Sequence, residues 1–356
     1  MGERLTGMGY RLLLLSWVLM MGLLGCGGDP SSSQGQAPTS SPTPPEMIAS
    51  PSVPSPEPML DSLSEAAPSL DGDRLFETVK ALAGPRFDPG DRDRARQYLK
   101  QQLEAAGWTV ESQTFDGGVN LIAQRDGTDA NAPILLLGAH YDTVANSPGA
   151  DDNASAVAAV LEAAYLLKAP TPRGLRLVLF DLEERGLQGS FAYVSPQTIE
   201  NLDGAIILEM IGYACEEIGC QTYPRGLPDS LPERGDFLGV VGNWPYHQLT
   251  DAFEESPRFE KPRRVTLTVP VGLFLDLLRS DHAPFWLAGV PAVMVTDTAN
   301  FRNPNYHRPS DTPDSLNRPF LEGSTQAVVD VLYQLLNRPQ DAANESHASG
   351  SAWGSN

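Results

Sequence analysis

The most informative segment of the chain covers residues 133–168 and reads PILLLGAHYDTVANSPGADDNASAVAAVLEAAYLLK. Residues 133–139 form an apolar run, which is typical of a strand buried on both faces of a sheet. Residues 152–168 are rich in Ala, Val and Leu, and this composition indicates a helix. A buried strand that leads through a polar turn into a helix predicts an α/β fold.

The same alternation of strands and helices continues on both sides of this segment. Strands are expected at 108–115, 119–125, 175–182, 205–208, 239–242, 264–269 and 292–296, and helices at 91–107 and 318–337. Strands that alternate with helices imply a sheet covered on both faces. We therefore expect an α/β domain with three layers, α/β/α, around a mixed, largely parallel central sheet.

The beginning of the chain has the composition of an export signal. Arg4 and Arg11 precede a short apolar run at residues 12–24. This run is shorter than the about 20 residues of a membrane span, so we expect a signal peptide at residues 1–25. Leu23, Gly25 and Cys26 resemble a bacterial lipoprotein box, which predicts lipidation of Cys26 and a lipid-anchored protein of the cell envelope. An ordinary secretory signal with an incidental cysteine is the alternative.

Composition divides the rest of the chain into three parts. Residues 26–70 are rich in Ser and Pro and predict a flexible linker, because they carry too few large apolar side chains to form a core. Residues 71–338 hold the α/β pattern, and the polar residues 339–356 predict a disordered tail. The formal net charge of −20 argues against nucleic acid as a partner, since a strongly acidic surface repels phosphates.

Two further cysteines, Cys215 and Cys220, lie close together in the sequence. In an exported protein such a pair is expected to form a local disulfide. A zinc knuckle is the alternative, although no second pair of cysteines or histidines lies nearby in the sequence.

Several predicted strands run directly into carboxylate or imidazole side chains. These are His140, Asp142, Glu183, Glu184 and Glu209, together with Asp151 in the turn before the helix at 152–168 and His307 after the last strand. Open α/β sheets bind ligands at the carboxyl ends of their strands, so we expect these groups to gather there. Imidazole and carboxylate ligands without thiolate suit zinc at a hydrolytic site, and a shared carboxylate suits a pair of ions.

Six short strings make the chain similar to a known family. They are GAHYDTV at 138–144, GADDNAS at 149–155, DLEERGLQGS at 181–190, LEMIGY at 208–213, SDHAPFWLAGVPAVM at 280–294 and YHRPSDT at 306–312. In this order they resemble metallopeptidase family 28, which includes zinc aminopeptidases and glutaminyl cyclase-like proteins. The chain looks like a bacterial lipoprotein member of that family, and the resemblance covers roughly residues 72–337.

The resemblance implies a role for each of these side chains. His140 and Glu209 would bind one zinc ion, Glu184 and His307 the other, and Asp151 would bridge both. Glu209 stands where aspartate is the more familiar residue. Asp142 would orient the imidazole of His140, and Glu183 would be the general base.

The implied activity is that of a zinc-dependent aminopeptidase, which hydrolyses the N-terminal residues of peptides with a water that bridges two zinc ions. One alternative is a glutaminyl-peptide cyclotransferase with a single zinc ion, for which Asp151, Glu184 and His307 would suffice. A second alternative is a non-catalytic binding protein of the cell envelope, which the presence of Glu183 disfavours.

Overall fold

The computed structural model describes residues 66–256, 262–272 and 274–338. The predicted signal peptide, Cys26, most of the predicted linker and the predicted tail lie outside these residues. Within them, no helix is both long enough and apolar enough to cross a membrane.

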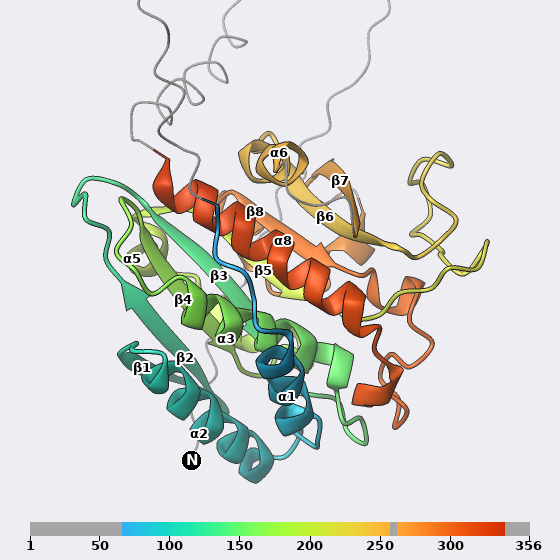
Figure 1. Cartoon of the computed structure of the whole chain (residues 1–356), viewed down its shortest axis with the longest axis horizontal. Helices are drawn as coiled ribbons and strands as arrows, with labels where there is room; N and C mark the ends of the chain where they lie inside the picture. Colours follow the sequence, from blue (N-terminus) through green and yellow to red (C-terminus); the bar gives the residue numbers. More distant parts are fainter. Residues whose placement is uncertain (1–65, 257–261, 273, 339–356) are drawn as a thin grey trace, which may run out of the picture. The chain divides into compact units, whose positions relative to one another are not determined.

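The centre of the fold is one mixed sheet. Its strands are β1 (Val110–Phe115), β2 (Gly118–Arg125), β3 (Ile134–His140), β4 (Gly174–Phe180), β5 (Leu202–Glu209), β6 (Phe237–Trp244), β7 (Arg263–Pro270) and β8 (Ala292–Thr296). Among the described residues they lie in the order β1-β2-β4-β3-β5-β8-β6-β7 (Figure 1). Four neighbouring pairs are parallel and three are antiparallel, so the prediction of a mixed, largely parallel sheet is confirmed.

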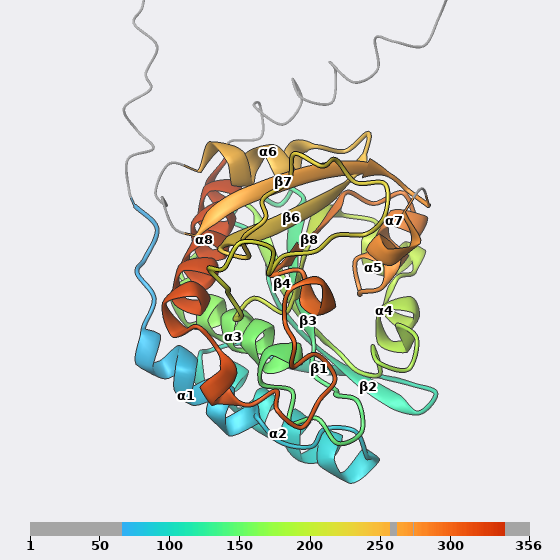
Figure 2. The same cartoon turned by 90° about the vertical axis from the view of Figure 1, so that its right-hand side faces the viewer.

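Helices cover both faces of this sheet, as the sequence predicts. One face carries α1 (Gly72–Leu82), α2 (Pro89–Ala105), α3 (Ala156–Leu166), α6 (Gln248–Glu255) and α8 (Arg318–Asn337). The other face carries α4 (Gln188–Tyr193), α5 (Pro196–Ile199) and α7 (Ala283–Leu287). Figure 2 shows the two layers on opposite sides of the strands. Each layer has its own apolar core against the sheet.

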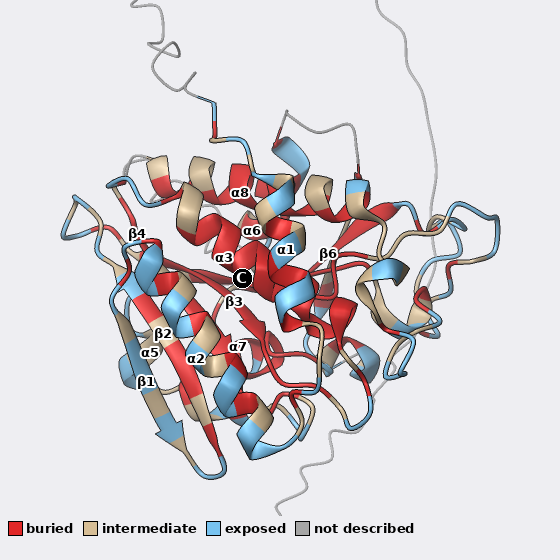
Figure 3. Cartoon of the chain, turned by 60° about the horizontal axis from the view of Figure 1, so that its bottom comes forward, coloured by how far each residue is buried: buried red, intermediate tan, exposed pale blue. Residues whose placement is uncertain are grey.

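Burial follows the position of a strand in the sheet. All seven residues of β3 are buried, because β4 and β5 flank it and helices cover its faces. No residue of the edge strand β1 is fully buried. Figure 3 shows this contrast between the centre and the edge of the sheet. The apolar run that predicts β3 is thus the run that the sheet buries most completely.

The boundaries of the helices have local causes. Helix α8 begins where the sequence predicts, because the side chain of Asn317 accepts a hydrogen bond from the backbone N–H of Phe320 and Pro319 occupies the first turn. Helix α1, which the sequence analysis does not predict, is capped in the same way by Asp71.

The helix expected at 152–168 begins later than predicted. Residues Ala150–Ser155 form a single wide π turn, and α3 starts only at Ala156. Gly149 precedes the turn at a φ of 61°, and a Cβ there would lie 2.3 Å from the carbonyl oxygen of Asp152. Only glycine therefore fits. This turn presents its aspartates at the edge where the parallel strands β3, β4, β5 and β8 end, here called the carboxyl edge.

Candidate metal centre

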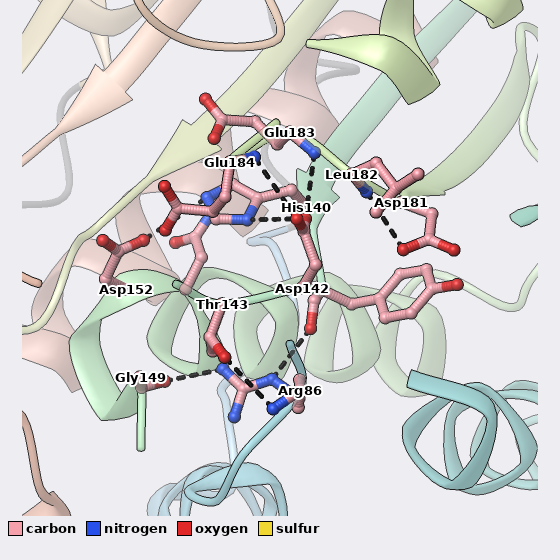
Figure 4. Close-up of polar contacts among 12 residues, drawn as sticks. Arg86, His140, Asp142, Thr143, Gly149, Asp152, Asp181, Leu182, Glu183 and Glu184 are labelled. Atoms are coloured by element: carbon pink, nitrogen blue, oxygen red, sulfur yellow. Dashed lines mark hydrogen bonds and ion pairs between the residues drawn. The ribbon is translucent and has the colours of Figure 1, made fainter. Parts of the chain in front are cut away.

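His140 is the last residue of β3, and its imidazole is buried at the carboxyl edge. Its Nδ1 lies 3.4 Å from Oδ1 of Asp142. The Asp142 carboxylate also accepts hydrogen bonds from the backbone N–H groups of Glu183 and Glu184, at 3.0 and 3.2 Å (Figure 4). Asp142 therefore connects the end of β3 to the loop after β4. It is placed to fix both the orientation of His140 and the position of the two glutamates.

Two groups of side chains at the carboxyl edge have the spacing of metal ligands. Within each group the potential ligand atoms lie within 4.8 Å of one another. The first group consists of His140, Glu183 and Glu209, and the second of Asp152, Glu184 and His307.

The Asp152 carboxylate connects these two groups. Its Oδ1 lies 3.5 Å from Nε2 of His140, and its Oδ2 lies 3.2 Å from Nε2 of His307. Each oxygen thus faces one histidine. Nε2 of His140 is also 3.5 Å from Oε2 of Glu209, and Nε2 of His307 is 3.1 Å from Oε2 of Glu184.

The expectation that Asp151 is the bridging carboxylate is wrong in this geometry. The Asp151 side chain is fully buried, and in the described part of the chain it belongs to neither group of candidate ligands. Its oxygens accept hydrogen bonds from the backbone N–H of Gly212 at 2.9 Å and from Nδ2 of Asn303 at 2.7 Å. Because consecutive side chains in the wide turn point in different directions, only Asp152 faces both histidines.

The other polar residues of the turn hold the loop that follows β5. Asn153 donates to the carbonyl of Leu208 and accepts from the N–H of Met210. Ser155 accepts from the N–H of Ile211. These bonds surround Glu209, so the turn that carries Asp152 also positions the loop that carries Glu209.

Asp311 joins this turn to the loop of His307. Its two oxygens accept hydrogen bonds from the backbone N–H groups of Asp151 and Asp152, at 2.9 and 3.1 Å. Asp311 lies in the string YHRPSDT, but its role cannot be predicted from that string. The spacing of residues in the sequence does not reveal this contact between a buried carboxylate and two backbone N–H groups of the turn.

A buried cation, Arg86, lies near the carboxylates of the candidate metal centre. The guanidinium of Arg86 donates to the carbonyl oxygens of Tyr141, Pro148 and Gly149, at 2.8, 2.9 and 2.8 Å (Figure 4). Burial lowers the pKa of Arg86 to about 10, against the opposing charge of Asp152. It remains a cation at neutral pH and holds together both ends of the loop between β3 and the turn. No pattern in the sequence identifies this arginine.

The two glutamates after β4 have altered proton affinities. Burial, reinforced by neighbouring carboxylates, raises the pKa of Glu183 well above its usual range. Burial and the charge of Asp152 raise the pKa of Glu184 to about 7. Burial would lower the pKa of His307, but its bonds to Asp152 and Glu184 outweigh this effect and raise it to about 10. Such displaced values are typical of functional sites.

Three residues beside these side chains adopt left-handed backbone conformations. The φ angles are 57° at Leu182, 47° at Met210 and 59° at His307. Residues other than glycine rarely adopt these values, which concentrate at functional sites because the surrounding structure must impose them. Leu182 precedes Glu183 and Met210 follows Glu209, so the strain lies next to the candidate ligands.

The donor atoms fit divalent metal ions. Nε2 of His140 and Oε1 of Glu184 are buried and make no hydrogen bond of ordinary geometry. Buried polar atoms without partners are costly unless a ligand satisfies them. Carboxylates and imidazoles without thiolate match zinc at a catalytic site, and one carboxylate that faces both histidines matches a pair of ions.

His282 leads to a prediction about the pH dependence of stability. Its imidazole is fully buried, and its Nε2 lies 2.7 Å from the carbonyl of Leu277. Burial lowers its pKa to about 4, so it is neutral in the folded protein and takes up a proton on unfolding below pH 6.5. The stability that it contributes above pH 6.5 is therefore lost as the pH falls towards 4.

We expect His282→Gln to reduce this loss. Between pH 7 and pH 4.5, the free energy of unfolding of the metal-free variant should fall by about 2 to 3 kcal/mol less than that of the metal-free wild type. Urea denaturation of both proteins at the two pH values measures the difference. An identical fall in both proteins would show that another group controls the acid sensitivity.

An α/β sheet with two connected imidazole–carboxylate groups at its carboxyl edge has the ligand types that metal-dependent hydrolases use. The model of peptidase family M28 matches residues 120–332. The uncharacterized protein YfbL of Escherichia coli is 34% identical over 259 residues, which are 68% of this chain and 80% of YfbL. The chain therefore belongs to peptidase family M28, and the predicted family is confirmed.

Other similar proteins are aminopeptidases by name. The probable lipoprotein aminopeptidase LpqL of Mycobacterium tuberculosis is 29% identical over 240 residues, which are 60% of this chain and 44% of LpqL. This chain therefore spans less than half the length of LpqL. Among solved structures, the aminopeptidase of Aneurinibacillus species strain AM-1 has a TM-score of 0.60 at 19% identity. The alignment covers 76% of this chain and 95% of the other, which shows the same fold.

Proposed function

We propose that the protein is a zinc-dependent aminopeptidase, which removes residues from the free amino end of peptides. The observation that carries this proposal is the Asp152 carboxylate, whose two oxygens each face one histidine while Glu183 lies beside them. Membership of peptidase family M28 and the names of the aminopeptidase relatives support the proposal.

The residues divide between two zinc ions. His140 and Glu209 would hold one ion, Glu184 and His307 the other, and Asp152 both. Ser280 donates a 2.7 Å hydrogen bond to Oε2 of Glu209 and orients this carboxylate. A zinc pair bound there would acidify a water molecule and polarise the scissile carbonyl.

Glu183 is the proton carrier in this proposal. It follows β4, and its backbone N–H is bonded to Asp142, which holds it at a fixed distance from His140. Its carboxylate accepts a proton from the attacking water and returns it to the leaving amine. Asp142 contributes by positioning both Glu183 and the His140 ring.

A cleft beside the candidate ligands has room for the end of a peptide. This cleft, of about 380 Å³, is lined by Asp152, Glu183, Glu184 and Glu209, with Arg279 and His307. In the proposed enzyme the zinc ions would offset the charge of the carboxylates that hold them, so the choice of the amino end is supported by the names of the aminopeptidase relatives. The partner that we propose is therefore a peptide with a free amino terminus.

We also propose that the protein is exported and held at the cell envelope by lipid on Cys26. The lipoprotein box in the sequence and the name of LpqL support this proposal. Labelling with a radioactive fatty acid tests it: the wild type should become labelled, and Cys26→Ser should not.

Metal removal tests the activity. We expect the protein to cleave fluorogenic aminoacyl amides, to bind two zinc ions per chain, and to lose at least about 100-fold of its activity after chelation, with recovery when zinc is added. Metal analysis and rate measurements on a panel of such amides provide the readout. One zinc ion together with cyclisation of N-terminal glutamine would instead identify a glutaminyl cyclase, and no reaction at all would favour a binding protein.

A further inference from the structure

An apolar cavity of about 100 Å³ lies next to the candidate metal centre. One water molecule needs about 10–15 Å³ of such cavity volume, so this cavity can hold a side chain of several heavy atoms. Its apolar lining includes Leu227, Leu231, Phe237, Leu267, Leu277 and Met294. The charged residues of the lining are Glu209, Asp276 and Arg279.

This cavity opens towards the cleft that holds the candidate ligands. Glu209, Arg279 and Tyr306 line both spaces. Tyr306 also stacks on the ring of His307, with 3.7 Å between the ring centroids, and accepts a hydrogen bond from Arg279 at 3.0 Å. A peptide whose amine lies beside Glu209 can therefore place its first side chain in the cavity.

One wall of the cavity consists of irregular chain. Thr222, Tyr223, Pro224, Leu227 and Leu231 all line it. Between β5 and β6 the chain forms neither helix nor strand, apart from a single bridge between Cys215 and Gly235. The position of this wall therefore depends on cross-links and on bonds outside regular structure.

The disulfide Cys215–Cys220, which the sequence predicts, lies where the two ends of this wall meet. Cys215 donates its N–H to Gly235 at 2.9 Å, just past the end of the wall. Cys220 lies two residues before Thr222. The N–H groups of Gly219 and Gln221 both donate to the carbonyl of Glu233. The disulfide ring thus brings the start of the wall against its end.

The wall is also attached to the loop after β8. The N–H of Thr222 donates to the carbonyl of Phe301 at 2.8 Å. The Gln221 side chain accepts from Nε of Arg302 at 2.8 Å and donates to Thr298 at 2.9 Å. Opening the disulfide would free the ring of residues 215–220 from its covalent constraint, and noncovalent contacts, these hydrogen bonds among them, would then hold the wall alone.

We infer that the Cys215–Cys220 disulfide sets the substrate selectivity of the protein. It anchors the wall at residues 222–231 against an apolar cavity that takes a large, uncharged N-terminal side chain, such as leucine, methionine or phenylalanine. This inference rests on the proposed aminopeptidase activity.

The wild type should prefer large apolar residues. We expect kcat/KM for leucyl amide to exceed that for alanyl amide by at least about tenfold, because each added methylene gains binding in an apolar pocket. Glutamyl and lysyl amides should be poorer substrates than leucyl amide, since their charges would be buried.

The variant Cys215→Ser/Cys220→Ser tests the role of the disulfide. Its preference for leucyl over alanyl amide should fall about tenfold, through a higher KM for leucyl amide rather than a lower kcat. The matched control is Ile218→Ser, which changes an exposed residue inside the same ring that does not line this cavity. The control should keep the wild-type preference.

Two further measurements test the inference even if the double variant does not fold. Wild-type protein reduced with a phosphine in the presence of zinc, and then capped with iodoacetamide, should show the same loss of preference. Leu231→Ser should also lower the preference without breaking the disulfide. Circular dichroism establishes that each preparation is folded.

An unchanged preference in the folded, disulfide-free protein would overturn the inference. An equal loss of activity on all amides, with metal still bound, would also overturn it, since a selectivity element must discriminate between substrates. If the wild type cleaves no aminoacyl amide, the proposed function itself fails. If it cleaves them without favouring apolar residues, only the present inference fails.

Discussion

Asp152→Asn is expected to remove most of the bound metal and nearly all of the activity, whereas Asp151→Asn is expected to keep the metal. Asp152 faces His140 with one oxygen and His307 with the other. An amide offers one weak oxygen ligand and no negative charge, so it cannot replace a carboxylate shared by two cations. We expect a loss of zinc affinity of more than about 100-fold and of kcat of at least about 10³-fold.

Asp151→Asn is the matched control, because it changes the adjacent residue in the same way. Asp151 bonds Gly212 and Asn303, so its replacement should lower stability by about 1 to 3 kcal/mol. Zinc titration by calorimetry, together with thermal unfolding, separates the two effects. If Asp151→Asn lost the metal while Asp152→Asn retained it, the assignment of the bridging ligand would be reversed.

Glu183→Gln is expected to abolish turnover with both metal ions still bound. Glutamine keeps the size of the side chain and leaves the backbone bond to Asp142 intact. It cannot accept a proton, however, and proton transfer by a positioned group contributes about 10² to 10⁴-fold to a rate. We therefore expect kcat to fall by about that factor while KM changes little.

The comparison with Glu184→Gln makes this test specific. Glu184 lies in the second group of candidate ligands with Asp152 and His307, so its replacement should lower zinc affinity as well as the rate. Metal analysis after dialysis, combined with steady-state kinetics on leucyl amide, distinguishes the two glutamates. Loss of zinc from Glu183→Gln would make Glu183 a ligand and would disprove its role as proton carrier alone.

The positions of most candidate residues follow from the sequence for one physical reason. A buried parallel strand is an apolar run, and the first polar residues after it must lie at the carboxyl edge. His140, Glu183 and Glu209 are each placed by this rule. The sheet and the helices on both faces are predictable on the same basis, since apolar patterns reflect burial.

Some functional residues cannot be found from the sequence, because they lie in turns and loops. There the hydrophobic pattern does not show which way a side chain points. Asp151 and Asp152 are chemically identical neighbours in a wide turn, and only backbone geometry decides which of them faces the histidines. Arg86 and Asp311 act through bonds to backbone groups that are distant along the chain. The wall at 222–231 has no apolar period, so its place beside the cavity depends on tertiary contacts.

The order of the strands has a consequence for the synthesis of the protein. Among the residues that the structure describes, the last strand is β8, which lies between β5 and β6, so within these residues β6 and β7 join the rest of the sheet only through β8. His307 comes later still. A nascent chain that ends before residue 292 lacks both β8 and His307, and the contacts between β5 and β8, about 90 residues apart, can form only after β8 has been made. The complete set of candidate ligands is therefore present only after the carboxyl-terminal part of the domain has been synthesised.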